Sequence, residues 1–163
     1  MHIELKNKKL IFDKYKVKCA IGKRGICTKK REGDNITPKG TFKILKLFYR
    51  KDRIKNINSS LNEVVIEKDM GWCDDPKSRS YNKLIKLPST FKAEKLYKKN
   101  NIYDIILVLD YNFNPVVKNK GSAIFIHIAS KNFKPTRGCI AINKYYMKLL
   151  VSFIKKNSKI KIR

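Results

Sequence analysis

Residues 121–143 read GSAIFIHIASKNFKPTRGCIAIN, and the fold is organised around this stretch. Residues 122–129 are an apolar run with β-branched and aromatic side chains, which predicts a strand. A polar loop over residues 130–137 turns the chain, and residues 139–142 predict a second short strand. Side chains alternate along a strand, so His127 and Cys139 point away from the isoleucines of their strands. If the two strands lie close together, the imidazole and the thiol face each other.

A thiol beside an imidazole can act as a nucleophile. The thiolate is the reactive form, and the imidazole both takes its proton and stabilises the ion pair. Gly138 favours this interpretation, because a glycine permits a strained backbone, close approach of a substrate and free N–H groups for an oxyanion. The alternative is that both side chains only pack, since cysteine is among the most buried residue types.

The charge of the chain is its most unusual property. Its 163 residues predict one domain spanning 1–163, which is long enough for a sizeable core. The 39 Lys and Arg residues outnumber the 13 Asp and Glu residues, giving a net charge of +26 that favours anionic polymers as partners. Only seven of the basic residues are Arg, the residue of bidentate phosphate and base recognition. We therefore expect non-specific binding of anionic polymers and no specific nucleic-acid binding.

Several classes of protein are disfavoured by what the chain does not contain. It has no apolar run of 18 residues, so no membrane-spanning helix is expected. The first ten residues have no apolar core or cleavage site of a secretion signal. No pair of the four cysteines has zinc-finger spacing, so a structural metal site is not expected. If Cys139 is a free thiol, at most one disulfide can form among the other three, so a disulfide framework is not expected either. The four cysteines are Cys19, Cys27, Cys73 and Cys139.

The remaining pattern predicts a mainly β protein with two helices. Strands are expected over residues 2–6, 9–12, 15–21, 41–48, 64–66, 103–111 and 159–162. The stretch Phe91–Lys99 predicts a short helix from its apolar spacing and its helix-forming residues. A second helix is expected from Lys144 to about Lys156, with Asn143 as its N-cap.

Two further segments stand out. Residues 30–42, KREGDNITPKGTF, have turn chemistry before a strand and could be a purely structural loop. Residues 70–76, MGWCDDP, place the only tryptophan, Trp72, beside Asp74 and Asp75 in a chain poor in carboxylates. Paired carboxylates can do acid–base work or bind a cation, but they can equally cap a turn or pair with lysines.

Taken together, three ordered blocks resemble the L,D-transpeptidase catalytic domains of the YkuD type over nearly the full length. Residues 30–42 resemble the family's GD-x-x-TP-x-G-x-F segment. The block of residues 71–76, with Tyr81-Asn82 and Leu87-Pro88, is similar to a segment of one short-chain subgroup. The third block, residues 121–141, resembles the His…[S/T]-x-G-C signature. Arg137 stands where the commoner pattern has His or Asn, and the spacing from His127 to Cys139 is shorter than in the best-known members.

The resemblance implies a β-sandwich of mixed sheets and a peptidoglycan L,D-transpeptidase that needs no cofactor or metal. Cys139 would attack the stem-peptide carbonyl before the terminal D-alanine, and His127 would carry the proton. N–H groups near Gly138 and Arg137 would hold the oxyanion, and an amine would resolve the thioester. An imidazolium partner and the positive field would lower the pKa of Cys139. The family implies a periplasmic or cell-envelope location.

Four further residues are expected to line the substrate cleft. They are Trp72, Asp74, Asp75 and Tyr81, and the carboxylates are expected to admit the acceptor amine. Two alternatives to a transpeptidase remain: an L,D-carboxypeptidase, with water as the acceptor, and a non-enzymatic basic module that binds a polyanion with Cys139 inert.

Overall fold

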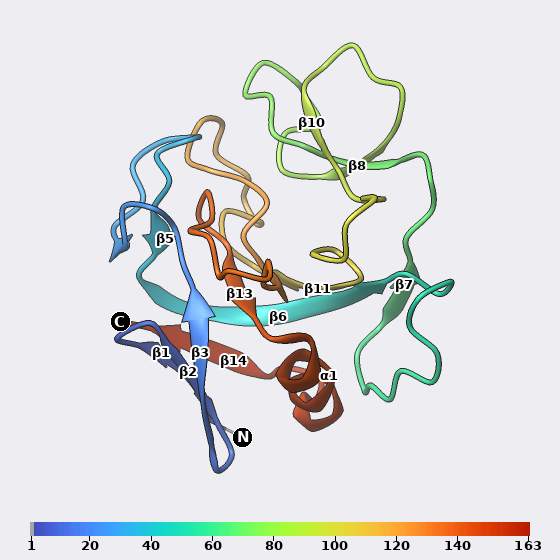
Figure 1. Cartoon of the computed structure of the whole chain (residues 1–163). Helices are drawn as coiled ribbons and strands as arrows, with labels where there is room; N and C mark the ends of the chain where they lie inside the picture. Colours follow the sequence, from blue (N-terminus) through green and yellow to red (C-terminus); the bar gives the residue numbers. More distant parts are fainter. Residues whose placement is uncertain (1) are drawn as a thin grey trace.

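A nine-stranded mixed sheet dominates the computed structural model, which describes residues 2–163 (Figure 1). The strand order is β11-β12-β13-β3-β2-β1-β14-β6-β7. The pairs β1–β14, β12–β13 and β6–β7 are parallel and the others are antiparallel. The strands are β1 (Ile3–Lys6), β2 (Lys9–Phe12), β3 (Tyr15–Ala20), β6 (Gly40–Tyr49), β7 (Glu63–Val65), β11 (Ile105–Leu109), β12 (Phe125–Ile128), β13 (Ile140–Ile142) and β14 (Lys159–Ile162).

The sheet closes on itself, because β11 pairs with β6 as well as with β12. The ten-residue strand β6 makes this possible. Its residues 40–43 pair with β14, and its residues 44–49 pair with β11, with a register shift between Val108 and Leu109. A bulge of this kind bends a strand and increases its twist. The structure is therefore mainly β, as predicted, but a closed, barrel-like sheet replaces the expected sandwich.

The alternation predicted for the signature strands is confirmed by the two main clusters of buried residues. The isoleucines of β12 and β13, together with Ile124, belong to the larger cluster, which fills the inside of the closed sheet. Phe125 belongs to the second cluster, and Cys139 packs against that cluster from its edge. Strand β11 is buried throughout, as its unbroken apolar run predicted. One face of strands β12 and β13 therefore packs in the core, and the opposite face is available for a functional site.

The helix near the C-terminus is also confirmed. Helix α1 (Lys144–Phe153) begins after Asn143, whose side chain accepts a hydrogen bond of 2.8 Å from the N–H of Tyr145. It ends three residues earlier than expected. Its buried residues, Met147, Leu150 and Val151, join the larger cluster, so the helix is held by one apolar face.

The helix predicted over Phe91–Lys99 is wrong. Residues Ala93–Lys95 form strand β10, which pairs with β8 (Met70–Cys73), and β8 pairs in turn with β9 (Leu84–Lys86). Helix propensity is a weak prior, and here pairing with β8 overrides it. Leu96 is buried beside Trp72, whereas Phe91 remains exposed, so no helical apolar face is formed.

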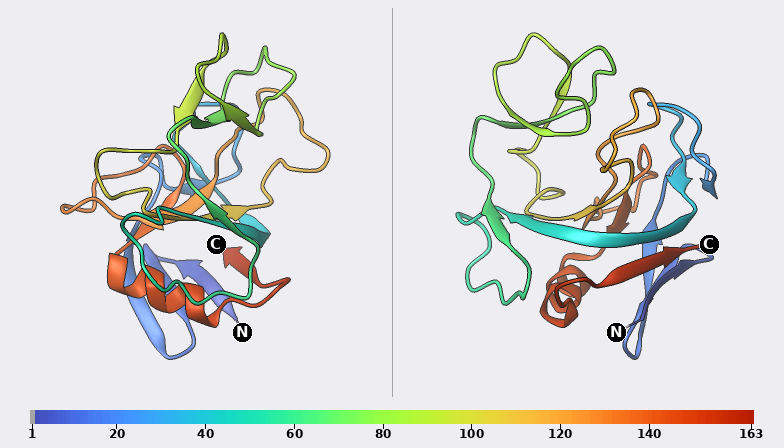
Figure 2. Two further views of the ribbon diagram at one scale, coloured as in Figure 1. Left: turned by 90° about the vertical axis from the view of Figure 1, so that its right-hand side faces the viewer. Right: turned by 180° about the vertical axis from the view of Figure 1, so that it is seen from behind.

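The three-stranded sheet of β8, β9 and β10 projects from the barrel, as Figure 2 shows from two sides. A smaller pair, β4 (Ile26–Cys27) and β5 (Thr37–Pro38), leads into the long strand β6. No helix among residues 2–163 is long and apolar enough to cross a membrane.

Candidate active site

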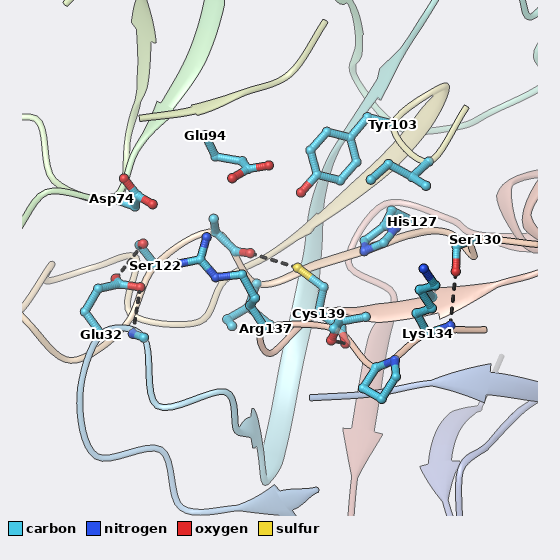
Figure 3. Close-up of a pocket in the computed structure, with 17 residues that line it drawn as sticks. Glu32, Asp74, Glu94, Tyr103, Ser122, His127, Ser130, Lys134, Arg137 and Cys139 are labelled. Atoms are coloured by element: carbon cyan, nitrogen blue, oxygen red, sulfur yellow. Dashed lines mark hydrogen bonds between the residues drawn. The ribbon is translucent and has the colours of Figure 1, made fainter. Parts of the chain in front are cut away.

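A cavity of about 290 Å³ lies where the signature strands meet the β8–β10 sheet and the loop before β5. His127 comes from β12, and Cys139 immediately precedes β13. Figure 3 shows both side chains in this cavity with the charged and polar groups around them. Those labelled groups are Glu32, Asp74, Glu94, Tyr103, Ser122, Ser130, Lys134 and Arg137.

The parallel pairing of β12 with β13 brings His127 and Cys139 to one face. His127 lies opposite Ala141, so Cys139, two residues before Ala141, points to the same side. Nδ1 of His127 lies 2.9 Å from the carbonyl oxygen of Ile128, which can only accept, so Nδ1 carries the proton. The other ring nitrogen, Nε2, is left as an acceptor. The Cys139 thiol donates to the carbonyl oxygen of Ala123 at 3.1 Å.

Loss of contact with water keeps the thiol and the imidazole neutral, although Cys139 is only partly buried whereas His127 is buried. This desolvation raises the pKa of Cys139 to about 12, although a backbone hydrogen bond at Phe125 and the charges of Lys29 and Arg137 act in the opposite direction. Burial also lowers the pKa of His127 to about 4. Desolvation disfavours the charged form of each group. The expectation of a lowered Cys139 pKa is therefore wrong, and the resting pair is a thiol and a neutral imidazole.

Gly138 is held in a conformation that suits glycine alone. Its φ is +141°, and a Cβ there would lie 2.9 Å from the carbonyl oxygen of Ile36. Its N–H donates to Oγ1 of Thr136 at 3.1 Å, and the Thr136 hydroxyl donates to the carbonyl of Cys139 at 2.6 Å. The N–H of Gly138 is thus already bonded, which does not support its expected role as an oxyanion donor. Arg137 lines the cavity and is exposed.

The segment of residues 30–42 contacts the backbone that carries Cys139 and holds it in place. The buried hydroxyl of Thr37 accepts from the N–H of Gly22 at 2.8 Å and donates to the carbonyl of Gly138 at 2.9 Å. Asp34 fixes the preceding turn, because its carboxylate accepts from the N–H groups of residues 30, 31 and 36 and from the buried Lys29 ammonium at 2.5 Å. Burial alone would raise the pKa of Asp34, but these bonds lower it to about 2.

Of the four residues expected to line the cleft, only Asp74 does so. Trp72 packs edge-on against Phe125, at 5.2 Å between ring centroids, and its indole N–H bonds Asn82. Tyr81 is buried, and its hydroxyl donates to Glu32. The carboxylate of Asp75 accepts from backbone N–H groups, including that of Lys77, and caps the turn. These three residues hold the walls in place and do not face the cavity.

The sequence did not point to three other cavity residues. Glu32 accepts hydrogen bonds from Tyr81 at 2.5 Å and from Ser122 at 2.6 Å. The only signal for Glu32 was its place in the first motif block. Glu94 comes from β10, in the segment predicted to be helical. The ring of Tyr103 packs edge-on against the ring of His127, with 5.2 Å between the ring centroids.

A thiol and an imidazole held in one cavity, with the imidazole oriented by a backbone carbonyl, define a candidate site of the cysteine-nucleophile class. The family model described as the L,D-transpeptidase catalytic domain, YkuD, matches residues 2–162, and the chain belongs to this family. The family is generally a cysteine-dependent transpeptidase, acts on peptidoglycan stem peptides and is typical of the cell envelope. No curated protein and no solved structure matches the chain.

Proposed function

We propose that the protein is a peptidoglycan L,D-transpeptidase that uses Cys139 as its nucleophile and His127 as its proton carrier. One observation carries the proposal: both side chains line one cavity, and the Ile128 carbonyl leaves Nε2 of the imidazole free to accept a proton. The match to the family over residues 2–162 supports the same reaction. The donor is a stem tetrapeptide with a diamino acid before its terminal D-alanine.

The reaction begins from the neutral pair. Nε2 of His127 takes the thiol proton as Sγ of Cys139 attacks the carbonyl carbon, so the S–C bond forms while the proton moves. This coupling avoids a free thiolate, which burial disfavours. The oxyanion is assigned to the N–H groups of Arg137 and Cys139, since the N–H of Gly138 is bonded to Thr136.

Collapse of this intermediate breaks the C–N bond, and His127 gives its proton to the leaving amine of D-alanine. A thioester on Cys139 remains. An acceptor amine then attacks the thioester and loses a proton to His127, the C–S bond breaks, and the thiol regains its proton. Water in place of the amine makes the same site an L,D-carboxypeptidase.

The proposal is tested with a synthetic stem tetrapeptide and an acceptor amine. Wild-type protein is expected to form a thioester, seen as a mass increase of the intact protein, and to release D-alanine and a cross-linked product. Cys139→Ala is expected to do neither. The control is Cys27→Ser, because Cys27 is exposed and lies outside the cavity. Turnover by Cys139→Ala would overturn the assignment of the nucleophile.

The same experiment separates the alternatives. D-alanine release without a cross-linked product, at any concentration of acceptor, would favour the carboxypeptidase. A wild-type protein that neither reacts with a carbapenem nor releases D-alanine would favour the non-enzymatic basic module.

A further inference from the structure

The three carboxylates of the cavity gather on one side of Cys139, where the guanidinium of Arg137 also lies. Figure 3 shows Glu32, Asp74 and Glu94 on one side of the Cys139 sulfur, and His127, Ser130 and Lys134 on the other. The three carboxylates come from separate segments of a chain that has only 13 acidic residues and a net charge of +26. Their convergence at one cavity is therefore not a consequence of composition.

Asp74 lacks a partner that its burial requires. Its Oδ1 is buried and has no hydrogen-bond partner among residues 2–163, while the whole residue is only 9% exposed. Its Oδ2 lies 3.8 Å from the ammonium of Lys92, a side chain that is 66% exposed. A buried acceptor left without a partner costs about 1–3 kcal/mol, and more when it is charged. Asp74 lines the cavity, and residues 2–163 leave one oxygen of this carboxylate without a donor.

The other two carboxylates are held in position beside it. Glu32 is fixed by the hydroxyls of Tyr81 and Ser122, and Glu94 pairs with Lys98 at 2.6 Å. Burial raises the pKa of Asp74, and the negative charges of Glu32 and Glu94 add to this, against Lys92 and Arg137. Lys98, Lys92 and Arg137 offset part of the repulsion between these groups, and a cation bound among the three carboxylates would offset more of it.

The position of His127 orients the donor peptide in this cavity. His127 must reach the leaving nitrogen to protonate it, so the leaving residue lies on the side of His127 and Lys134. The acyl part of the donor then lies on the opposite side of Cys139, against the carboxylates. In the proposed reaction this acyl part ends in a diamino acid, whose side chain carries an ammonium group.

We propose that Glu32, Asp74 and Glu94 form an ammonium subsite for the side-chain amine of the donor residue whose carbonyl Cys139 attacks. The inference rests on the proposed function and deepens it. It differs from the expectation drawn from the sequence, in which Asp74 and Asp75 admit the acceptor amine. The subsite selects the donor, and it acts before the thioester forms.

The test uses two donor peptides that differ in one charge. One is a stem tetrapeptide with a free side-chain amine at position three, and the other is the same peptide with that amine acetylated. Hydroxylamine, which is uncharged at neutral pH, serves as the acceptor for both. The readout is the ratio of kcat/KM for D-alanine release from the two donors.

Wild-type protein is expected to prefer the free amine by about 10- to 100-fold, the range of one hydrogen-bonded charge. Asp74→Asn and Glu94→Gln are each expected to bring this ratio toward one, whatever happens to the separate rates. The matched control is Glu63→Gln, which also removes one negative charge but lies exposed on β7, outside the cavity. Thermal unfolding of each variant shows that it is folded.

Each other outcome overturns the inference in a recognisable way. If the ratio of kcat/KM for the two donors stays at the wild-type value in both variants, the carboxylates do not bind the side-chain amine of the donor. Changed use of cationic acceptors with an unchanged donor ratio would assign them to the acceptor. Equal rates for the two donors in wild-type protein would overturn the subsite alone. The absence of any thioester would overturn the proposed function and this inference with it.

Discussion

The hydroxyl of Thr37 donates a 2.9 Å hydrogen bond to the carbonyl oxygen of Gly138, 101 residues farther along the chain. The same hydroxyl accepts from the N–H of Gly22 at 2.8 Å, and Thr37 is fully buried. One side chain therefore ties the first motif block to the backbone that presents Cys139. This contact gives the first block a physical role in the site, although none of its atoms needs to take part in the chemistry.

We expect Thr37→Val to impair acylation as well as stability. Valine keeps the shape of the side chain but leaves the Gly138 carbonyl and the Gly22 N–H without their buried partner, at about 1–3 kcal/mol each. Urea unfolding measures the loss of stability. The rate of thioester formation per folded molecule measures the displacement of Cys139, and we expect it to fall by ~10-fold or more.

Thr37→Ser is the control for this prediction, because serine keeps the hydroxyl and loses only a methyl group. It is expected to retain most of the acylation rate. Equal acylation rates for the valine and serine variants would show that the bond to Gly138 stabilises the fold without positioning the nucleophile.

Local patterns predicted the parts of the fold that depend on neighbouring residues. The alternation of Ile124, Ile126 and Ile128 identified the buried face of β12 and left His127 on the other face. The cap at Asn143 identified the start of α1. Closure of the sheet was not predictable in this way, because it depends on β11 pairing with β6, more than 50 residues earlier.

The candidate site shows the same division. His127 and Cys139 could be found because His127 lies in β12 and Cys139 immediately precedes β13, and these two strands pair side by side. Asp74 and Asp75 could not be told apart, since adjacency in sequence does not say which carboxylate faces the cavity and which caps the turn. Glu32 and Glu94 escaped notice because only the tertiary fold brings their separate segments together. The pKa of Cys139 was predicted in the wrong direction because the sequence does not report its burial.

Lys29 and Asp34 form a buried ion pair. We expect replacement of Asp34 to lower the free energy of unfolding more than replacement of Lys29 does. The two side chains are each 2% exposed and lie 2.5 Å apart. Asp34→Asn leaves a buried ammonium without its counter-charge and weakens the turn, so we expect a loss of about 3–5 kcal/mol. Lys29→Met leaves Asp34 with three backbone donors, and a smaller loss is expected. Urea unfolding at neutral pH compares the two, and equal losses would contradict this assignment.

Gly138→Ala is expected to displace the nucleophile. The backbone conformation at φ +141° and the contact of 2.9 Å with the Ile36 carbonyl both oppose a Cβ, and a backbone oxygen cannot turn aside. The comparison is Gly25→Ala, where φ is +80° but no atom lies within 4 Å of the added Cβ. We expect both variants to lose about 1–2 kcal/mol from backbone strain, and only Gly138→Ala to lose thioester formation as well. An active Gly138→Ala protein would show that the site tolerates this shift.

The buried imidazole makes stability depend on pH in a defined window. Burial lowers the pKa of His127 from 6.5 in the unfolded chain to about 4 in the folded protein. Between these values the unfolded state binds more protons, so the free energy of unfolding falls as the pH is lowered from 6.5 to about 4. The contribution is fully present above pH 6.5, and about 3 kcal/mol is lost by pH 4.

Urea unfolding of wild-type protein and of His127→Gln over pH 4–8 measures this term, because the titration of all carboxylates is common to both proteins. The difference in unfolding free energy is expected to shrink as the pH falls below 6.5 and to be constant above it. His2→Gln is the matched control, since His2 is the only other histidine and its side chain is 70% exposed. A His127→Gln protein whose stability follows the wild-type pH dependence throughout would mean that folding does not shift the pKa of His127, which would contradict its burial as a neutral group. A difference that instead shrinks as the pH rises above 6.5 would mean that the folded state favours the imidazolium, and the neutral thiol–imidazole pair would have to be replaced by an ion pair.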